Sequence, residues 1–267
     1  DFEDADQLLI KAQKNNTKKD TVVVLMKAKI YARNKNYTRA LEILEPLHKD
    51  VPSNSTILRQ LYAIYMSLED PENLRDLLPH LKRYKVFKKN KINEIEIYIY
   101  RSSIEIISKN NATHTEDLNN FWHKIPRSLK REKTIFLQYV TKLHEFKEDT
   151  AAELLIHSFL KSDWDDELIR LYGLIAGPDN EKQLRYAESL LSIHPDNPEL
   201  MLALGRLNLK CKLWVKAQDY FKSSIAIKPK TETYIELARL MEHQHKYKES
   251  SIYYQQGLSL NHNQKIT

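Results

Sequence analysis

Glycine is scarce in this chain of 267 residues, which contains only Gly173, Gly177, Gly205 and Gly257. Average usage would give about nineteen glycines. A dinucleotide fingerprint needs three closely spaced glycines, and a P-loop needs two that are followed by Lys and Ser or Thr. Neither pattern occurs, so nucleotide-dependent chemistry of these two types is excluded. The scarcity also argues against an all-β fold, because tight hairpins rely on residues with positive φ.

Cysteine and long apolar runs are also lacking. Cys211 is the single cysteine, so the chain forms neither an internal disulfide nor a multi-thiolate zinc site. The apolar runs are far shorter than the roughly 18 to 20 residues of a membrane span. The sequence opens on Asp1-Phe2-Glu3-Asp4 with no leader-like segment, and we expect it to be part of a longer protein. The chain is rich in Leu, Ile, Ala, Lys, Glu and Tyr, and this composition favours helices.

A repeat of the tetratricopeptide type, about 34 residues long, runs through the sequence. In this pattern a first helix carries a Leu-small pair, and a second helix carries a small residue, a bulky residue and a terminal Pro. Residues 198–231 match it with Leu204-Gly205, Ala217, Phe221 and Pro229. The copy 33 residues later matches with Leu237-Ala238, Ser250, Tyr254 and Gly257. Trp214 and Tyr247 coincide at the predicted start of the second helix.

The pattern is looser in the rest of the chain. Residues 21–54 and the following copy repeat it, and a degenerate unit lies between residues 163 and 195. Residues 90–162 are predicted to be helical but weakly repetitive. Within them, residues 92–100 alternate apolar and polar side chains as a strand would, yet their setting in a helical array favours a long helix. The sequence therefore predicts an all-α fold, in which tetratricopeptide-like helical hairpin repeats form a right-handed superhelical solenoid.

An ordered series of landmarks extends over residues 118–260. They are Phe121-Trp122, Ile125-Pro126, Leu143, Trp164-Asp165, Leu168-Ile169, Tyr172-Gly173, Ala187-Glu188, His194-Pro195, Leu204-Gly205-Arg206, Trp214, Lys216-Ala217, Ser223, Tyr234, Leu237-Ala238 and Gly257-Leu258. In order and spacing this series resembles the C-terminal tetratricopeptide portion of the HemY proteins of proteobacteria. We accordingly expect N-terminal repeats over 1–110 and HemY-like repeats over 111–267, as one array with a hinge near residues 109–115.

The resemblance implies a function that composition alone does not indicate. HemY proteins are non-enzymatic factors linked to the late steps of haem (protoporphyrin) biosynthesis. They carry two N-terminal transmembrane helices, absent from this chain, and their repeats project from the bacterial inner membrane into the cytoplasm. The expected partners are proteins, including enzymes of late haem synthesis. The predicted function is thus a protein-interaction scaffold of the HemY type. A tetrapyrrole-binding carrier or sensor, and a peptide-binding repeat module unrelated to haem, remain alternatives.

Positive charge is concentrated in one segment, although the formal net charge of the chain is only +6. Between Leu81 and Asn93 there are six cations and no acid, namely Lys82, Arg83, Lys85, Lys88, Lys89 and Lys91. This basic patch would suit anionic lipid headgroups or an acidic partner, or it would simply be a solvated helix face. Nucleic acid is not an expected partner, because no recognisable binding module is present.

A second set of cations is predicted from the repeat register, which directs certain first-helix positions toward the concave groove. These positions are Lys29, Arg33, Arg59, Arg206, Lys210 and Arg239. A row of such cations would hold the carboxylates of a partner segment. The alternative is that they only keep the groove soluble, with Glu199, Glu232 and Glu236 partly neutralising them.

No catalytic residue, metal site or bound cofactor is predicted. Asp165-Asp166-Glu167 fits the first turn of a helix, where acids favour the positive end of the dipole. His243 and His245 are two residues apart, which places them on different faces of a helix. His194, in a turn before Pro195, is assigned a structural role. Haem or protoporphyrin binding is retained only as part of the carrier alternative.

Overall fold

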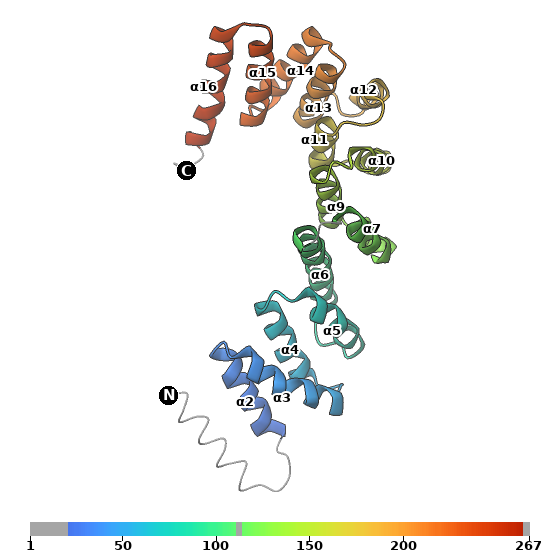
Figure 1. The fold of residues 1–267 in the computed structure, drawn as a ribbon, viewed down its shortest axis with the longest axis vertical. Helices are drawn as coiled ribbons and strands as arrows, with labels where there is room; N and C mark the ends of the chain where they lie inside the picture. Colours follow the sequence, from blue (N-terminus) through green and yellow to red (C-terminus); the bar gives the residue numbers. More distant parts are fainter. Residues whose placement is uncertain (1–20, 111–113, 264–267) are drawn as a thin grey trace. The chain divides into compact units, whose positions relative to one another are not determined.

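The computed structural model describes residues 21–110 and 114–263, and in this part of the chain every regular element is a helix. There are 15 α-helices and one short 3-10 helix among these residues (Figure 1). By its internal contacts the chain divides into two compact units, residues 1–135 and residues 136–267, here called the N-terminal and C-terminal units.

The N-terminal unit is built from helical hairpins. Its helices are α2 (Thr21–Arg33), α3 (Tyr37–Asp50), α4 (Ser55–Ser67), α5 (Pro71–Arg83), α6 (Lys89–Asn110), α7 (His114–Lys124) and α8 (Arg127–Lys130). The start of α4 follows the start of α2 by 34 residues, and α5 follows α3 by the same interval. One apolar cluster joins α2, α3, α4, α5 and the first half of α6, from Ala28 to Ile99.

The C-terminal unit contains four successive hairpins. Its helices are α9 (Lys133–Glu145, which begins just before the unit boundary), α10 (Asp149–Leu160), α11 (Asp166–Leu174), α12 (Asn180–Ser189), the 3-10 turn η1 (Leu190–Ser192), α13 (Pro198–Lys210), α14 (Trp214–Ile227), α15 (Thr231–His243) and α16 (Tyr247–Asn263). The start of α15 follows that of α13 by 33 residues, and α16 follows α14 by the same interval.

The prediction of an all-α array of tetratricopeptide-like hairpins is confirmed. Residues 92–100 lie inside the long helix α6, as their setting in the sequence favoured. One hairpin was not singled out by the sequence: α9 and α10 are as regular as their neighbours, although residues 133–160 match the repeat pattern poorly. The predicted hinge near 109–115 includes residues 111–113, which lie outside the described residues, and it stays a prediction.

Most turns between the two helices of a hairpin close without glycine. A residue in the left-handed region follows the first helix at Lys35, Glu69, Lys147, Lys212 and His245, with φ between 52° and 65°. At Lys212 the next amide, of Leu213, donates to the Asn208 carbonyl at 2.8 Å, and the Lys212 amide donates to the Leu209 carbonyl at 3.0 Å. This is the Schellman arrangement that usually employs glycine. The chain therefore carries a small backbone strain at each of these turns.

Glycine is used instead where two helices approach closely. A Cβ added to Gly173 on α11 would lie 2.5 Å from the Ala203 Cα on α13. A Cβ on Gly205 of α13 would lie 2.3 Å from the ring of Phe221 on α14, which is fully buried. Gly173 fits one hairpin against the next, and Gly205 fits the two helices of one hairpin together, so the packing of the C-terminal unit depends on both.

Replacing Lys212 by glycine is expected to stabilise the protein. A left-handed conformation costs a non-glycine residue roughly 1 kcal/mol, so Lys212→Gly should raise the free energy of unfolding by up to about 1 kcal/mol. The matched control, Lys222→Gly on the exposed face of α14, should lower it by about 1 kcal/mol. Urea unfolding measures both. If the two variants lost the same free energy of unfolding, the strain at Lys212 would be contradicted.

Adding a methyl group at Gly173 is expected to destabilise the C-terminal unit. Gly173→Ala drives its Cβ against the backbone of α13, and overpacking of this kind costs about 2–3 kcal/mol. Ser158→Ala, an exposed helical position on α10, is the control and should change the free energy of unfolding by less than about 0.5 kcal/mol. Thermal unfolding that is unchanged in Gly173→Ala would rule out the close approach of α11 and α13.

Candidate interaction groove

The basic patch lies at the turn between α5 and α6. Helix α5 ends at Arg83, and Lys85 then adopts φ 50°, with the Val86 amide donating to the Leu81 carbonyl at 3.1 Å. The chain reverses at once and enters α6 at Lys89. Because the turn is so short, lysines from its two sides and from the start of α6 surround the same space. Lys85 also has a left-handed backbone conformation, but it lies between two hairpins, whereas the other described residues of this kind lie within one.

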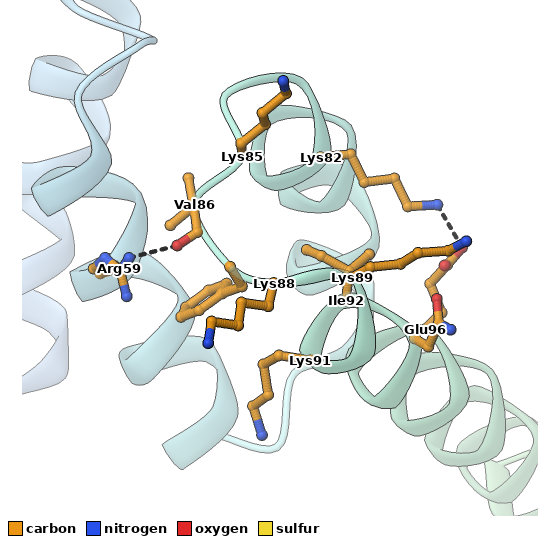
Figure 2. A pocket seen from close by; sticks show the side chains of 11 residues that line it. Arg59, Lys82, Lys85, Val86, Lys88, Lys89, Lys91, Ile92 and Glu96 are labelled. Atoms are coloured by element: carbon orange, nitrogen blue, oxygen red, sulfur yellow. Dashed lines mark hydrogen bonds and ion pairs between the residues drawn. The ribbon is translucent and has the colours of Figure 1, made fainter.

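A hollow of about 1000 Å³ lies beside this turn and is here called the basic hollow (Figure 2). Its cationic lining residues are Arg59, Lys82, Lys85, Lys88, Lys89 and Lys91. Its apolar lining consists of Val86, Phe87 and Ile92, of which Val86 and Ile92 are buried. Figure 2 shows the ammonium groups of Lys85, Lys88 and Lys91 pointing in different directions around the turn. The hollow thus combines an apolar floor with a cationic rim.

Arg59 connects α4 to the turn. Its Nη2 donates to the Val86 carbonyl, as Figure 2 shows, and its guanidinium group lies 4.9 Å from the centre of the Phe87 ring. The ring of Tyr62, one turn further along α4, meets the Phe87 ring edge-on at a centroid distance of 4.9 Å. These contacts fix the floor of the hollow. Arg59 itself remains exposed, so donors of its planar group are left for another acceptor.

The positive charge of the basic hollow is only partly neutralised. Lys82 is paired with Glu96 at 2.6 Å, and Lys91 with Glu94 at 2.9 Å. The hydrogen bond to Glu94 is the largest of the influences that raise the pKa of Lys91, so this lysine keeps its charge. Lys85, Lys88 and Lys89 form no ion pair with a described residue. The first turn of α6 also contains no acid, so the positive end of its dipole adds to the field.

A second, smaller hollow of about 430 Å³ lies between α2 and α4. It is lined by Lys29, Arg33 and Arg59, with Ala63 and Ile64 among its apolar residues. Three of the predicted groove cations therefore lie together. Since Arg59 lines both hollows, the predicted groove cations and the basic patch, which are separate in the sequence, meet at this residue. Arg83 does not line either hollow; its guanidinium group lies 5.8 Å from the Tyr84 ring.

Arg206 differs from its prediction as a groove cation available to a partner. It is only 5% exposed, and it binds two acids of α15: Nη2 donates to Glu232 at 2.6 Å and Nε donates to Glu236 at 2.9 Å. Arg170 on α11 also binds Glu232, at 3.0 Å. Burial alone would raise the pKa of Glu232, but hydrogen bonding and charge from Arg206, followed by Arg170, lower it below its usual value. The neutralisation expected from the neighbouring acids occurs, and it is nearly complete at Arg206.

Lys210 also differs from its prediction as a free cation, whereas Arg239 is exposed and its place in a groove stays a prediction. The Lys210 ammonium group donates to the Leu174 carbonyl at 2.9 Å and to the Ile175 carbonyl, at the end of α11. Burial lowers the pKa of Lys210 to about 8. Arg239 is exposed on α15 beside the Tyr254 hydroxyl. Arg206 and Lys210 therefore hold the hairpins of the C-terminal unit together, and the predicted row of free cations is restricted to the N-terminal unit and Arg239.

Histidines in the C-terminal unit pack against aromatic rings. His194 stacks on Trp164 with ring centroids 3.7 Å apart, and His243 stacks on Trp214 at 4.5 Å. These contacts agree with the structural role assigned to His194. Among the described residues, no three His, Cys, Asp or Glu side chains are grouped so that they could hold a metal ion.

The sequence did not indicate the floor of the basic hollow or the part played by Arg59. Phe87 and Ile92 stand among the lysines of residues 85–92, and this interleaving was the available signal. Arg59 lies 27 residues before the carbonyl that it binds, so its place depends on the packing of α4 against α5 and on the turn that follows.

Comparison with known proteins yields weak but consistent likenesses. No family model matches the chain. Protein HemY of Escherichia coli K12 and that of Shigella flexneri are each 22% identical to it over 229 residues, which is 86% of this chain and 57% of the relative. The chain thus spans little more than half the length of these curated relatives.

Solved structures with related folds are more distant. A human IFIT1 dimer is 15% identical over 96% of this chain and 64% of its own, with a TM-score of 0.44. The C-terminal part of a TPR repeat-containing protein from Cytophaga hutchinsonii is 17% identical over 88% of this chain and 78% of its own, with a TM-score of 0.34. The fold assignment therefore rests on the helices and their 33- to 34-residue intervals.

No helix within residues 21–110 or 114–263 combines the length and the apolar character that crossing a membrane requires.

Removing Arg206 is expected to destabilise the C-terminal unit strongly. Arg206→Ala leaves two acids without their main partner, and breaking a buried pair of this kind costs about 3–5 kcal/mol. Arg185→Ala, which removes an exposed pair with Glu181 at 3.5 Å, is the control and should cost less than about 1 kcal/mol. Similar unfolding midpoints for the two variants would contradict this assignment.

The same network predicts how stability depends on pH. The lowered pKa of Glu232 means that the unfolded state binds this proton more tightly than the folded state does. Its contribution is therefore present above the unfolded value near 4.5 and is lost as the pH falls through the folded value. In Arg206→Ala, this part of the acid-induced loss of stability should be reduced in urea titrations between about pH 5 and pH 3.

Proposed function

We propose that this chain is the interaction region of a HemY-type protein, a non-enzymatic scaffold associated with late haem biosynthesis. It binds partner proteins, including enzymes of that stage, through the N-terminal unit. The observation that carries the proposal is the basic hollow, in which three lysines without ion-pair partners surround an apolar floor. Such a site binds by shape and charge and contains no arrangement of nucleophile, base and oxyanion donors.

Two further observations support the association with haem biosynthesis. The ordered landmarks over residues 118–260 resemble those of HemY proteins, and the similarity to Escherichia coli HemY extends over 86% of the chain. In keeping with that family, the full protein is attached to the bacterial inner membrane through spans outside this chain, and its repeats lie in the cytoplasm.

The alternative function, a carrier or sensor of tetrapyrroles, has less support. The lining of the basic hollow contains no His, Cys, Met or Tyr that could serve as an axial ligand to haem iron. A generic peptide-binding module unrelated to haem would use the same hollow, and it differs from the proposal only in the identity of the partner.

The proposal is tested in cells of the source bacterium that lack the protein. We expect porphyrin precursors to accumulate in these cells, because the late enzymes are no longer held together, and haem to fall. The full-length protein should restore both levels. Porphyrins and haem are measured by fluorescence and absorbance of cell extracts. Unchanged levels of both in the deletion strain would remove the link to haem biosynthesis and leave the generic binding module.

A further inference from the structure

The two hollows of the N-terminal unit point to the chemistry of the partner. Building on the proposed scaffold function, we propose that they bind an extended acidic peptide segment of a partner protein. Its carboxylates meet Arg59 and the unpaired lysines, and one bulky apolar side chain enters the basic hollow over Phe87 and Ile92.

The positive charge of the basic hollow indicates that the bound segment is acidic. Six cations line the basic hollow, and its acidic lining residue, Glu96, is already paired with Lys82. Lys85, Lys88 and Lys89 lie within five residues of each other on one tight turn, so they repel one another when no anion is present. Carboxylates relieve this repulsion. Arg59 offers a planar group for bidentate contact and is held in place by the Val86 carbonyl and the Phe87 ring.

The apolar floor defines a second feature of the segment. Val86, Phe87 and Ile92 face a hollow of about 1000 Å³, which is ample room for a large side chain. Burying a Phe or Leu side chain contributes about 1.5–3 kcal/mol, a gain that a purely ionic contact does not provide. An acidic segment without such a side chain should therefore bind more weakly.

The position of the second hollow indicates that the bound segment is extended. Arg59 lines both hollows, and Lys29 and Arg33 lie on α2 at the far side of the smaller one. Arg59 on α4 reaches the turn before α6, and α2 packs against α4. With neighbouring helices about 8–10 Å apart, a path from that turn over α4 to α2 is roughly 20 Å long. About six residues in extended conformation cover this distance. A segment that crosses both hollows thus meets cations along its whole length.

A peptide fits these features better than a membrane or a nucleic acid does. A bilayer surface is flat, whereas several of the cations border a hollow whose floor a bilayer would not reach. Nucleic acids gain affinity by stacking bases on aromatic faces. Phe87 is the one aromatic residue in the lining of the basic hollow, so successive bases would find no series of rings on which to stack.

The test uses fluorescein-labelled peptides of about nine residues and fluorescence polarisation with the purified chain. One peptide has Phe at its centre and Asp or Glu elsewhere. A second has Ala at the centre, and a third keeps Phe but replaces the acids by Asn and Gln. We expect the first to bind most tightly, the second about tenfold more weakly, and the third not measurably. Affinity for the first should fall as salt is raised.

Variants locate the binding site. The double variant Lys85→Glu/Lys88→Glu should weaken binding of the acidic Phe peptide by at least about tenfold, and Phe87→Ala should remove the difference between the Phe and Ala peptides. Lys161→Glu/Lys228→Glu, which makes the same charge change at exposed positions of the C-terminal unit, is the matched control and should bind as the unaltered chain does. Circular dichroism checks that every variant remains folded.

Three results would overturn the inference. Equal affinity for the Phe and Ala peptides would mean that the apolar floor takes no part. Loss of affinity in both double variants would indicate a general charge effect. Sedimentation with phosphatidylserine vesicles that is stronger than peptide binding and is lost in Lys85→Glu/Lys88→Glu would identify a membrane surface as the ligand.

The cell experiment separates this inference from the proposed function. Peptides that fail to bind would overturn the inference, while restored haem in complemented deletion cells would still uphold the scaffold. Conversely, tight and site-specific peptide binding upholds the inference even when the deletion strain has normal porphyrin and haem levels.

Discussion

Each helical hairpin in this chain can bury its apolar face only against a neighbouring hairpin, and this constraint governs the rest of the structure. It requires close approach at the contacts, and Gly173 and Gly205 provide it where a methyl group would collide with Ala203 or Phe221. It does not require glycine in the turns. Five hairpin turns instead accept a left-handed Lys, Glu or His, since a small strain there is offset by the packing of the helices on both sides.

The same constraint determines whether a charged residue on the first helix of a hairpin is buried and paired or stays exposed. In the C-terminal unit Arg206 and Lys210 lie where successive hairpins meet, so burial forces them to find partners: Glu232 and Glu236 for one, two carbonyls of α11 for the other. In the N-terminal unit Lys29 and Arg33 hold the same positions of α2 that Arg206 and Lys210 hold in α13, and they stay exposed, as does Arg59. The turn before α6 and the start of that helix then add Lys85, Lys88 and Lys89, which form no ion pair with a described residue. Unbalanced positive charge is therefore a property of the N-terminal unit, and it is there that a partner of opposite charge gains most.

The fold could be predicted from the sequence because the residues of the repeat pattern are the ones that pack between the helices. Leu204-Gly205, Ala217 and Phe221 are conspicuous in the sequence for the same reason that they are buried in α13 and α14. The hairpin of α9 and α10 matches the pattern less well, because Val140 stands where α13 has Gly205 and Ile156 stands where α14 has Phe221.

The candidate site was predictable only in part. The lysine run of the basic patch is visible in the sequence, but its joining to Arg59 depends on a contact across 27 residues. The sequence predicts that Glu199, Glu232 and Glu236 neutralise part of the row of groove cations, but it does not predict which cations are buried. Lys29 and Arg206 are each the ninth residue of their helix, α2 and α13, yet Lys29 is exposed whereas Arg206 is buried against two acids of α15.

If the unpaired lysines of the basic hollow receive the carboxylates of a partner, their own NMR signals must respond when an acidic peptide binds. Reductive methylation with carbon-13 gives each lysine its own NMR signal, and the acidic Phe-containing peptide is then titrated in. We expect the signals of Lys85, Lys88 and Lys89 to shift and saturate together, while those of Lys161 and Lys228 stay in place. Small, unsaturable shifts spread over all lysines would contradict this expectation.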